Sequence, residues 1–303
     1  MATHTFLLPA GFGWQYHFIL WIQSFHTPIL DKVATVLSYL GTESFYLIIL
    51  PIVFLAFSRQ FGLRLTYVFL TSMFFNAWLK SVIQIARPIG VPGVRSLYLS
   101  TATGLSTPSG HAQGTITLWA ALVRYLPTRV LRYALLTLVL LIGISRVYLG
   151  LHWPMDVVFG WLLGLIIGYA GWQIGRWWSY RGIPWHFALA FAILFPAVLF
   201  YFNHDPRGAE YAAYLFAIGT GTVIERRFIH SAIEAVWWKR ICAGVIGVGG
   251  MVAIQWGLQS AESVLPWLLL RDLLIGWWVT VGAPWIFLKL NVYQPDTEAY
   301  AGS

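Results

Sequence analysis

Long apolar stretches, separated by short polar loops, make up most of this chain. Nine of them approach the length of about 20 residues that a helix needs to cross roughly 30 Å of hydrocarbon, although the third and seventh are short. They cover residues 42–57, 63–81, 111–125, 130–149, 155–177, 185–202, 211–224, 241–258 and 266–288. The pattern therefore predicts an all-α, polytopic transmembrane helical bundle of about nine spans.

The N-terminal stretch, residues 14–40, differs from the others because Pro28, Asp31 and Lys32 interrupt it. The interruption favours one or two helices that lie along the membrane interface over a single span. The stretch has no basic n-region and no small-residue cleavage site, so we do not expect a signal peptide. Residues 1–40 are therefore predicted to form interfacial helices.

The composition agrees with an integral membrane protein. Hydrophobic residues fill 58% of the 303 positions and charged residues 10%, and the mean hydropathy is +0.69. A soluble domain usually carries about a quarter charged residues. The 17 Trp and 15 Tyr, many of them at the ends of stretches, suit the headgroup level of a bilayer. The single cysteine, Cys242, excludes an intramolecular disulfide.

Basic residues are concentrated in alternate loops. The net charge is +8, but no basic run exceeds two residues, so topology explains it better than nucleic-acid binding does. By the positive-inside rule the Arg- and Lys-rich loops face the cytoplasm, and the intervening loops face the periplasm, the exterior or an organelle lumen. The basic loops contain Arg59, Arg64, Arg124, Arg129, Arg132, Arg176, Arg181, Arg226, Arg227, Lys239 and Arg240.

Three polar clusters lie on the opposite side from these basic loops. In the first, Lys80 and Arg87 are two helical turns apart, so both charges are expected on one helix face, and Pro88 is expected to end that helix. A cation near mid-membrane costs roughly 2.5–3.5 kcal/mol on insertion scales, so two such cations favour an anionic partner. Two cations that snorkel to the membrane boundary are the alternative.

The second cluster is Pro108-Ser109-Gly110-His111, followed by an apolar run. It predicts a helix start with a serine or threonine cap. Free backbone N–H groups and a glycine at such a start allow a phosphate oxygen to approach closely. An anion site beside His111 is one interpretation, and simple capping with an incidental histidine is the other.

The third cluster joins Ser145-Arg146 to His152 and Asp156, with Pro154 suited to a first helical turn. A carboxylate one turn from a histidine fixes its tautomer and leaves the other ring nitrogen free as a nucleophile or base. Arg146 adds a planar fork of donors that suits phosphate. A structural His–Asp pair that caps a helix is the alternative interpretation.

Taken in order, the motifs resemble those of the type 2 phosphatidic acid phosphatase (PAP2) superfamily. The likeness covers roughly residues 40–177 and is filled at every motif position: Lys80 with Arg87-Pro88, Pro108-Ser109-Gly110-His111, and Ser145-Arg146 with His152 and Asp156. The resemblance implies that His152 forms a phosphohistidine, that Asp156 supports it and that His111 is the general acid. It also implies a phosphate-binding set, made up of Lys80, Arg87, Ser109, Gly110 and Arg146.

Four regions follow: interfacial helices at 1–40, a PAP2-like catalytic core at 41–180, further transmembrane helices at 181–290, and a polar cytoplasmic tail at 291–303. We expect a metal-independent phosphatase of a lipid phosphate or pyrophosphate, acting outside the cytoplasm in a bacterial inner membrane. We expect no cofactor, nucleic acid or obligate protein partner. Undecaprenyl pyrophosphate, phosphatidic acid, phosphatidylglycerol phosphate and a sphingoid phosphate all remain open as substrates.

Three alternatives also remain open. The extra C-terminal helices are reminiscent of glucose-6-phosphatase, which would make the substrate a small soluble ester. A transporter or scramblase would bury cations along a pathway, but the chain has no related halves. A catalytically inactive scaffold is disfavoured by the complete set of chemical residues. Charges in the C-terminal region, such as Arg271-Asp272, are expected to be ordinary boundary charges, with mutual structural pairs or a second polar cavity as the alternatives.

Overall fold

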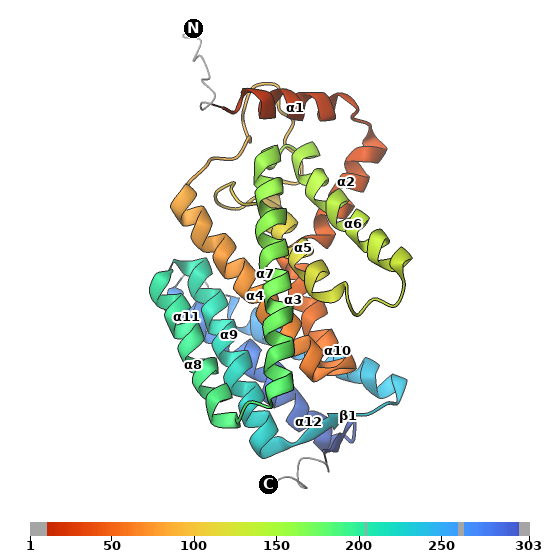
Figure 1. The fold of residues 1–303 in the computed structure, drawn as a ribbon, viewed down its shortest axis with the longest axis vertical. Helices are drawn as coiled ribbons and strands as arrows, with labels where there is room; N and C mark the ends of the chain where they lie inside the picture. The colour runs from red at the N-terminus through yellow and green to blue at the C-terminus, as the bar shows by residue number, and fades with distance from the viewer. Residues whose placement is uncertain (1–10, 204, 260–263, 297–303) are drawn as a thin grey trace. The chain divides into compact units, whose positions relative to one another are not determined.

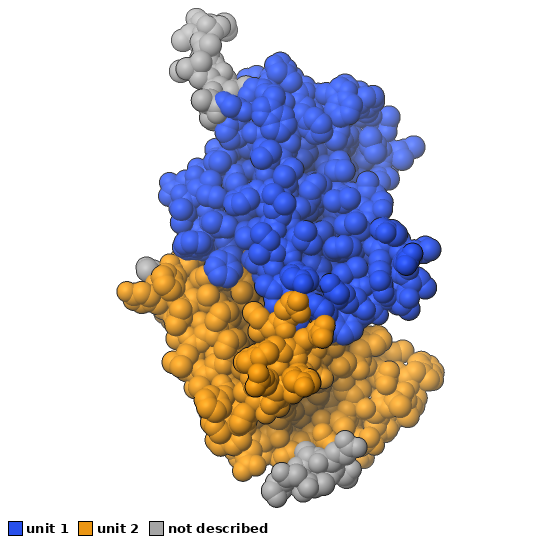
Figure 2. All heavy atoms as spheres, in the orientation of Figure 1, with its two compact units in different colours: residues 1–46, 75–172 blue, residues 47–74, 173–303 orange. Residues whose placement is uncertain are grey.

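The computed structural model describes residues 11–203, 205–259 and 264–296 (Figure 1). The chain divides into two compact units (Figure 2). Unit 1 comprises Met1–Tyr46 and Phe75–Trp172, and unit 2 comprises Leu47–Phe74 and Gln173–Ser303. All of the residues predicted to carry out chemistry belong to unit 1.

Unit 1 is built from helices whose starts can be read from the sequence. Thr27 accepts a hydrogen bond from the N–H of Leu30 at the start of α2, and Thr128 does the same for Leu131 at the start of α6. The elements of this unit are α1 (Gly13–Ser24), α2 (Pro28–Leu40), the end of α4 (Arg59–Ile83), the 3₁₀ turn η2 (Leu99–Thr101), α5 (Gly110–Leu122), α6 (Arg129–Tyr148) and the first part of α7 (Pro154–Arg181).

Helices α5 and α7 pack closely because small residues line the contact. A Cβ added at Gly160 would lie 2.7 Å from the carbonyl oxygen of Ser109, and one at Gly164 would lie 2.4 Å from that of Gln113. Gly168 is similarly close to Thr117. This backbone approach sets the start of α5 beside the start of α7, and it therefore brings the second and third motifs together.

Unit 2 is a second helical assembly with its own apolar core, which includes Phe54, Leu55 and Phe287. Two three-residue strands pair antiparallel, with Ala232 opposite Gln294. The elements are most of α3 (Glu43–Ile52), the π turn η1 (Val53–Phe57), the beginning of α4, the end of α7, α8 (Trp185–Phe202), α9 (Pro206–Ile224), η3 (Glu225–Ile229), β1 (Ser231–Ile233), α10 (Trp237–Gly257), α11 (Leu265–Trp277), η5 (Trp278–Gly282), α12 (Ala283–Lys289) and β2 (Tyr293–Pro295).

Each of the nine predicted stretches contains a helix, and the all-α, polytopic class is confirmed. Within the described ranges, five helices are long and apolar enough to cross a membrane, or six if Pro28–Leu40 and Glu43–Phe57 form one span. The number nine therefore stays a prediction, as does the interfacial position of residues 1–40. Of the predicted polar tail, residues 293–295 form β2, and residues 297–303 lie outside the described part.

One local prediction is wrong. Helix α4 ends at Ile83, and Gln84 has a φ of 55°, so the helix does not continue to Pro88. Lys80 therefore lies in the last helical turn, whereas Arg87 belongs to the connecting segment, residues 84–109, in which η2 is the one short helical turn. Within this segment the N–H of Ser106 donates to the carbonyl of Ile85 (2.8 Å), and this closes the segment into a loop.

Candidate active site

His152 lies at the centre of the residues predicted to carry out chemistry. It occupies the turn before α7 and is 1% exposed. Its Nδ1 is 3.2 Å from Oδ2 of Asp156, and its Nε2 is 2.7 Å from Nη1 of Arg87. The two ring nitrogens thus contact a carboxylate on one side and a guanidinium on the other. Because the guanidinium can only donate, Nε2 carries the lone pair and Nδ1 carries the proton.

Asp156 is held by several donors besides His152. Oδ2 accepts hydrogen bonds from the N–H of Trp153 (2.8 Å) and from Oγ of Ser106, and Oδ1 accepts one from Oγ1 of Thr107. Asp156 is 2% exposed and sits in the first turn of α7, as its spacing from Pro154 predicted. These donors keep the carboxylate oriented toward the histidine ring and offset the cost of burying its charge.

The environment of His152 favours the neutral imidazole. Burial, followed by the charges of Arg87, Arg146 and Lys80, lowers the pKa of His152 well below its ordinary value. A neutral ring with its proton on Nδ1 has a nucleophilic lone pair on Nε2.

Arg87 is fixed by backbone carbonyls. Nε donates to Gly104 (2.9 Å), Nη2 donates to Thr103 (3.0 Å), and Nη1 donates to Leu151 (2.8 Å). Three carbonyls on two segments therefore define the plane of this guanidinium. Together with the contact between Nη1 and Nε2 of His152, these bonds occupy four of the five N–H groups of Arg87 and fix its positive charge beside the histidine ring.

Arg146 is fully buried near the end of α6. Its Nη1 donates to Oγ1 of Thr101 (2.9 Å) and to Oγ of Ser38 (2.5 Å). Its Nε has no hydrogen-bond partner among the described residues. Arg146 pairs with no carboxylate in the part of the chain that the structure describes, and because a buried, unpaired guanidinium is costly, this one favours an anionic ligand.

Two further motif residues also carry a buried atom without a hydrogen-bond partner within the described residues. These atoms are Oγ of Ser109 and Nε2 of His111. Ser109 occupies the N-cap position of α5, as predicted, but its side chain makes no capping hydrogen bond, so the predicted cap by a hydroxyl of Ser109 is wrong. His111 lies within electrostatic range of Arg146 and His152. Buried polar atoms are nearly always satisfied, so three such atoms in one set of motifs point to a ligand.

The structure thus brings together the predicted residues. Gly110 is the first residue of α5, next to Ser109, whose N–H donates to the backbone carbonyl of Asp156 (3.0 Å). Lys80 contributes through its charge, which acts on both His111 and His152.

Sequence reasoning missed the segment that organises this cluster, residues 101–107. Within it, Thr101 contacts Arg146, and Thr103 and Gly104 contact Arg87. Ser106 and Thr107 contact Asp156. The available signal was compositional, because hydroxyl residues are dense just before Pro108. Spacing gave no indication of which group each hydroxyl would bind.

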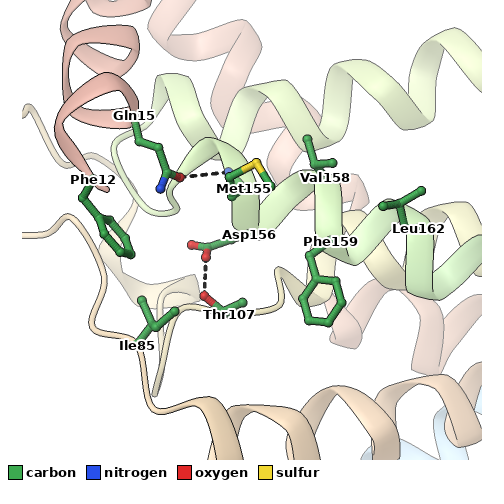
Figure 3. Close-up of a pocket in the computed structure, with 9 residues that line it drawn as sticks. All are labelled: Phe12, Gln15, Ile85, Thr107, Met155, Asp156, Val158, Phe159 and Leu162. Carbon is green, nitrogen blue, oxygen red and sulfur yellow. Dashed lines mark hydrogen bonds between the residues drawn. The ribbon is translucent and has the colours of Figure 1, made fainter. Parts of the chain in front are cut away.

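A pocket of about 250 Å³ borders the other side of Asp156 (Figure 3). Figure 3 shows the Asp156 carboxylate beside Thr107 at the pocket wall, with Gln15 of α1 reaching toward Met155. Most of the lining is apolar. It consists of Phe12, Gln15, Ile85, Thr107, Met155, Asp156, Val158, Phe159 and Leu162.

Comparison with known proteins identifies the family. The model described as PAP2 superfamily matches residues 61–180, and the one described as PAP2 superfamily phosphatase, transmembrane extension, matches residues 209–295. Phosphatidylglycerophosphatase B of Bacillus subtilis is 32% identical over 156 residues, which are 46% of this chain and 72% of that protein. The chain belongs to the PAP2 superfamily. The matched region 61–180 contains all three motifs.

Other PAP2 relatives match over shorter shares. Dihydrosphingosine 1-phosphate phosphatase of Schizosaccharomyces pombe is 32% identical over 50% of this chain and 40% of that protein. Undecaprenyl-diphosphatase of Sulfolobus acidocaldarius is 33% identical over 39% of this chain and 56% of that protein. The chain thus spans about half the length of these two relatives. The crystal structure of Aquifex aeolicus LpxE has 25% identity and a TM-score of 0.47, covering 57% of this chain and 99% of that one.

This PAP2 protein is therefore an integral membrane phosphatase. It is a hydrolase of phosphoric monoesters or diphosphates, and the transmembrane extension and apolar helices make it a membrane protein.

Proposed function

We propose that this PAP2 protein hydrolyses a lipid phosphate or diphosphate through a phosphohistidine, without a metal ion, at the extracytoplasmic side of a bacterial inner membrane. One observation carries the proposal. Three buried atoms without partners among the described residues, Ser109 Oγ, His111 Nε2 and Arg146 Nε, belong to the motif cluster around His152. A phosphoryl group offers oxygen acceptors for all three.

The first step is an in-line displacement at phosphorus. Arg87, Arg146 and the N-terminus of α5 bind the phosphoryl oxygens and offset their charge, with Lys80 adding to the positive field. Nε2 of His152 attacks phosphorus, and the bond from phosphorus to the lipid oxygen breaks. His111 donates a proton to the leaving oxygen, since a bound dianion favours its protonated form.

The second step restores the enzyme. His111, now neutral, accepts a proton from water as the water oxygen attacks the phosphohistidine. The bond between phosphorus and Nε2 breaks, inorganic phosphate leaves, and His152 becomes neutral again. Asp156 stabilises the positive charge that the ring of His152 carries between the two steps.

The lipid assignment is supported by the membrane location of the chain and by the relatives. Their names describe a phosphatidylglycerophosphatase and an undecaprenyl-diphosphatase. A soluble ester is the second candidate, because glucose-6-phosphatase catalytic subunit 1 of Haplochromis nubilus is 28% identical over 46% of each chain. We therefore include both classes of substrate in the experiment.

The test measures phosphate release by the purified protein in detergent with excess EDTA. The panel comprises phosphatidylglycerol phosphate, phosphatidic acid, a sphingoid phosphate, undecaprenyl diphosphate and glucose 6-phosphate. We expect EDTA-resistant release from a lipid, and a loss of at least about 10³-fold in His152→Ala. His186→Ala, at an exposed position in α8, is the matched control and should retain activity. Full activity in His152→Ala would refute the phosphohistidine route.

The orientation has its own experiment. In a Cys242→Ser background, Ser100→Cys places a thiol at an exposed position of the connecting segment, and Tyr180→Cys places one at the exposed end of α7, beside Arg181. A membrane-impermeant maleimide applied to intact spheroplasts should label the first variant, and the second only after lysis. The reverse labelling pattern would put the site on the cytoplasmic side.

A further inference from the structure

Helix α1 buries two glutamines on one side and exposes several aromatic residues on another. Gln15, Ile19 and Gln23 are spaced four apart and are 5%, 0% and 5% exposed. The opposite side presents aromatic rings, all at least 39% exposed, which suit the interface between headgroups and acyl chains. The exposed residues are Trp14, Phe18 and Trp21, continued by Phe25 just after the helix. Amides buried on the inner side of an interfacial helix are expected to form hydrogen bonds there.

Gln15 holds the first turn of α7. Its Oε1 accepts a hydrogen bond from the N–H of Met155 (3.0 Å), the residue before Asp156 (Figure 3). The first N–H groups of a helix have no partner within the helix, so an outside acceptor fixes the position of the helix end. Gln15 therefore acts on the helical turn that aims Asp156 at His152.

Gln23 connects two other parts of the cluster. Its Nε2 donates to the carbonyls of Arg95 (2.7 Å) and Tyr148 (2.8 Å), and its Oε1 accepts from the N–H of Arg95 (3.0 Å). Tyr148 is two residues beyond Arg146, and Arg95 lies in the connecting segment that also carries Arg87. One amide thus ties the end of α6 to that segment.

The apolar residue between the two amides packs in the same place. Ile19 belongs to a buried cluster with Ala112 of α5, Val147 of α6 and Trp153 beside His152. Helix α1 therefore contacts the surroundings of all three motifs through one stripe. In Figure 1 it runs across the ends of α6 and α7.

From these contacts we propose that α1 is a positioning element of the active site, seated at the membrane interface by its aromatic side. Gln15 and Gln23 set the geometry of His152, Asp156 and Arg146 without touching substrate. The inference rests on the proposed function for its effect on turnover. Helix α1 also lies outside residues 61–180, so the matched PAP2 region does not include these contacts.

The experiment compares Gln15→Met, Gln23→Met and the double variant with wild type. Methionine keeps the length of the side chain and removes its polar atoms. We expect kcat to fall about 10-fold to 100-fold in each single variant, because a misplacement of about 1 Å has an effect of that size. KM should change little in Gln15→Met, because Gln15 contacts the turn that carries Asp156, and should rise in Gln23→Met, because Gln23 contacts the end of α6 that carries Arg146. His17→Ala, at an exposed position of α1, is the matched control and should retain kcat.

Hydrogen–deuterium exchange provides a readout that does not depend on activity. We expect faster exchange at residues 147–157 in Gln15→Met and Gln23→Met, with wild-type exchange in the C-terminal helices α8 to α10. If the wild-type protein hydrolyses no member of the panel but both variants exchange faster at residues 147–157, the positioning role of α1 stands and the proposed function is refuted. Wild-type kcat together with wild-type exchange in both variants would overturn the role of α1.

Discussion

Both units bury charged side chains, but they arrange them differently. In unit 1 the contacts cross long stretches of sequence: Arg87 reaches His152 over 65 residues, and Arg146 reaches Ser38 over 108. In unit 2 the charged side chains of the described residues pair with one another, some locally and others, such as Arg59 with Glu225 and Arg271 with Glu210, over long stretches. Arg271 bonds to its neighbour Asp272, and Lys239 pairs with Glu234 five residues away. Buried charge alone is therefore a weak sign of a site, whereas convergence of distant segments on one histidine is a strong one.

Arg59 and Glu225 form one of the long-range ion pairs of unit 2, and their surroundings are structural. Arg59 pairs with Glu225, donates to Ser231 at the start of β1 and stacks 5.1 Å from the ring of Tyr293 in β2. These contacts join the short sheet to the beginning of α4. The pair thus has carboxylate, hydroxyl and ring partners, which is the pattern expected of a structural charge.

The largest expected effect contrasts two buried aspartates. Asp156→Asn should lower kcat about 10³–10⁴-fold, because the amide no longer holds the Nδ1–H tautomer of His152 or stabilises its positive charge. Asp272→Asn should keep kcat near wild type and lower the thermal midpoint, because it weakens the pair with Arg271. Steady-state kinetics and thermal unfolding of both variants measure the contrast. A large loss of kcat in folded Asp272→Asn would mean that unit 2 takes part in the chemistry.

Local sequence signals predicted one half of the site. The four-residue spacing of His152 and Asp156, with Pro154 between them, determines a helix start with the carboxylate below the ring, and the structure has both. The start of α5 at Gly110 was equally local. These features depend on helix geometry within one or two turns, which the sequence encodes directly.

The other half depends on contacts between distant segments. Arg87 leaves the helical register because the segment after Ile83 turns back toward residues 101–107, and periodicity does not encode such a turn. The packing of Gly160 against Ser109 and the role of Gln23 likewise depend on which helices become neighbours. Because the sequence does not show which segments become neighbours, it does not predict the hydrogen-bond partners of a buried amide such as that of Gln23.

A smaller effect is expected from the segment that sequence reasoning missed. Ser106→Ala removes one donor to Asp156 and should lower kcat about 10-fold to 100-fold, as loss of an outer partner of a catalytic group often does. Ser145→Ala is the matched control, since its hydroxyl bonds to the carbonyl of Ile142 within α6. The measurement is the steady-state kcat of Ser106→Ala and of Ser145→Ala. Equal activities would show that Asp156 does not need the hydroxyl of Ser106.

The smallest expected effect concerns pH and the stability of unit 1. The pKa of folded His152 lies well below its ordinary value, mainly because of burial. In the unfolded chain the ring gains a proton near its usual pKa of about 6.5, so stability is present above that pH and is lost as pH falls below it. The loss is at most about 1.4 kcal/mol for each pH unit.

This linkage can be isolated by comparing wild type with His152→Gln. The thermal midpoint of wild type should fall further between about pH 7.5 and about pH 5.5 than that of the variant, because glutamine cannot be protonated in this range. Asp156→Asn is included as a second comparison. Its amide still keeps the imidazole of His152 buried, so the thermal midpoint of this variant should also fall further than that of His152→Gln as the pH is lowered. Equal falls in wild type and His152→Gln would mean that His152 takes up its proton as readily in the folded protein as in the unfolded chain.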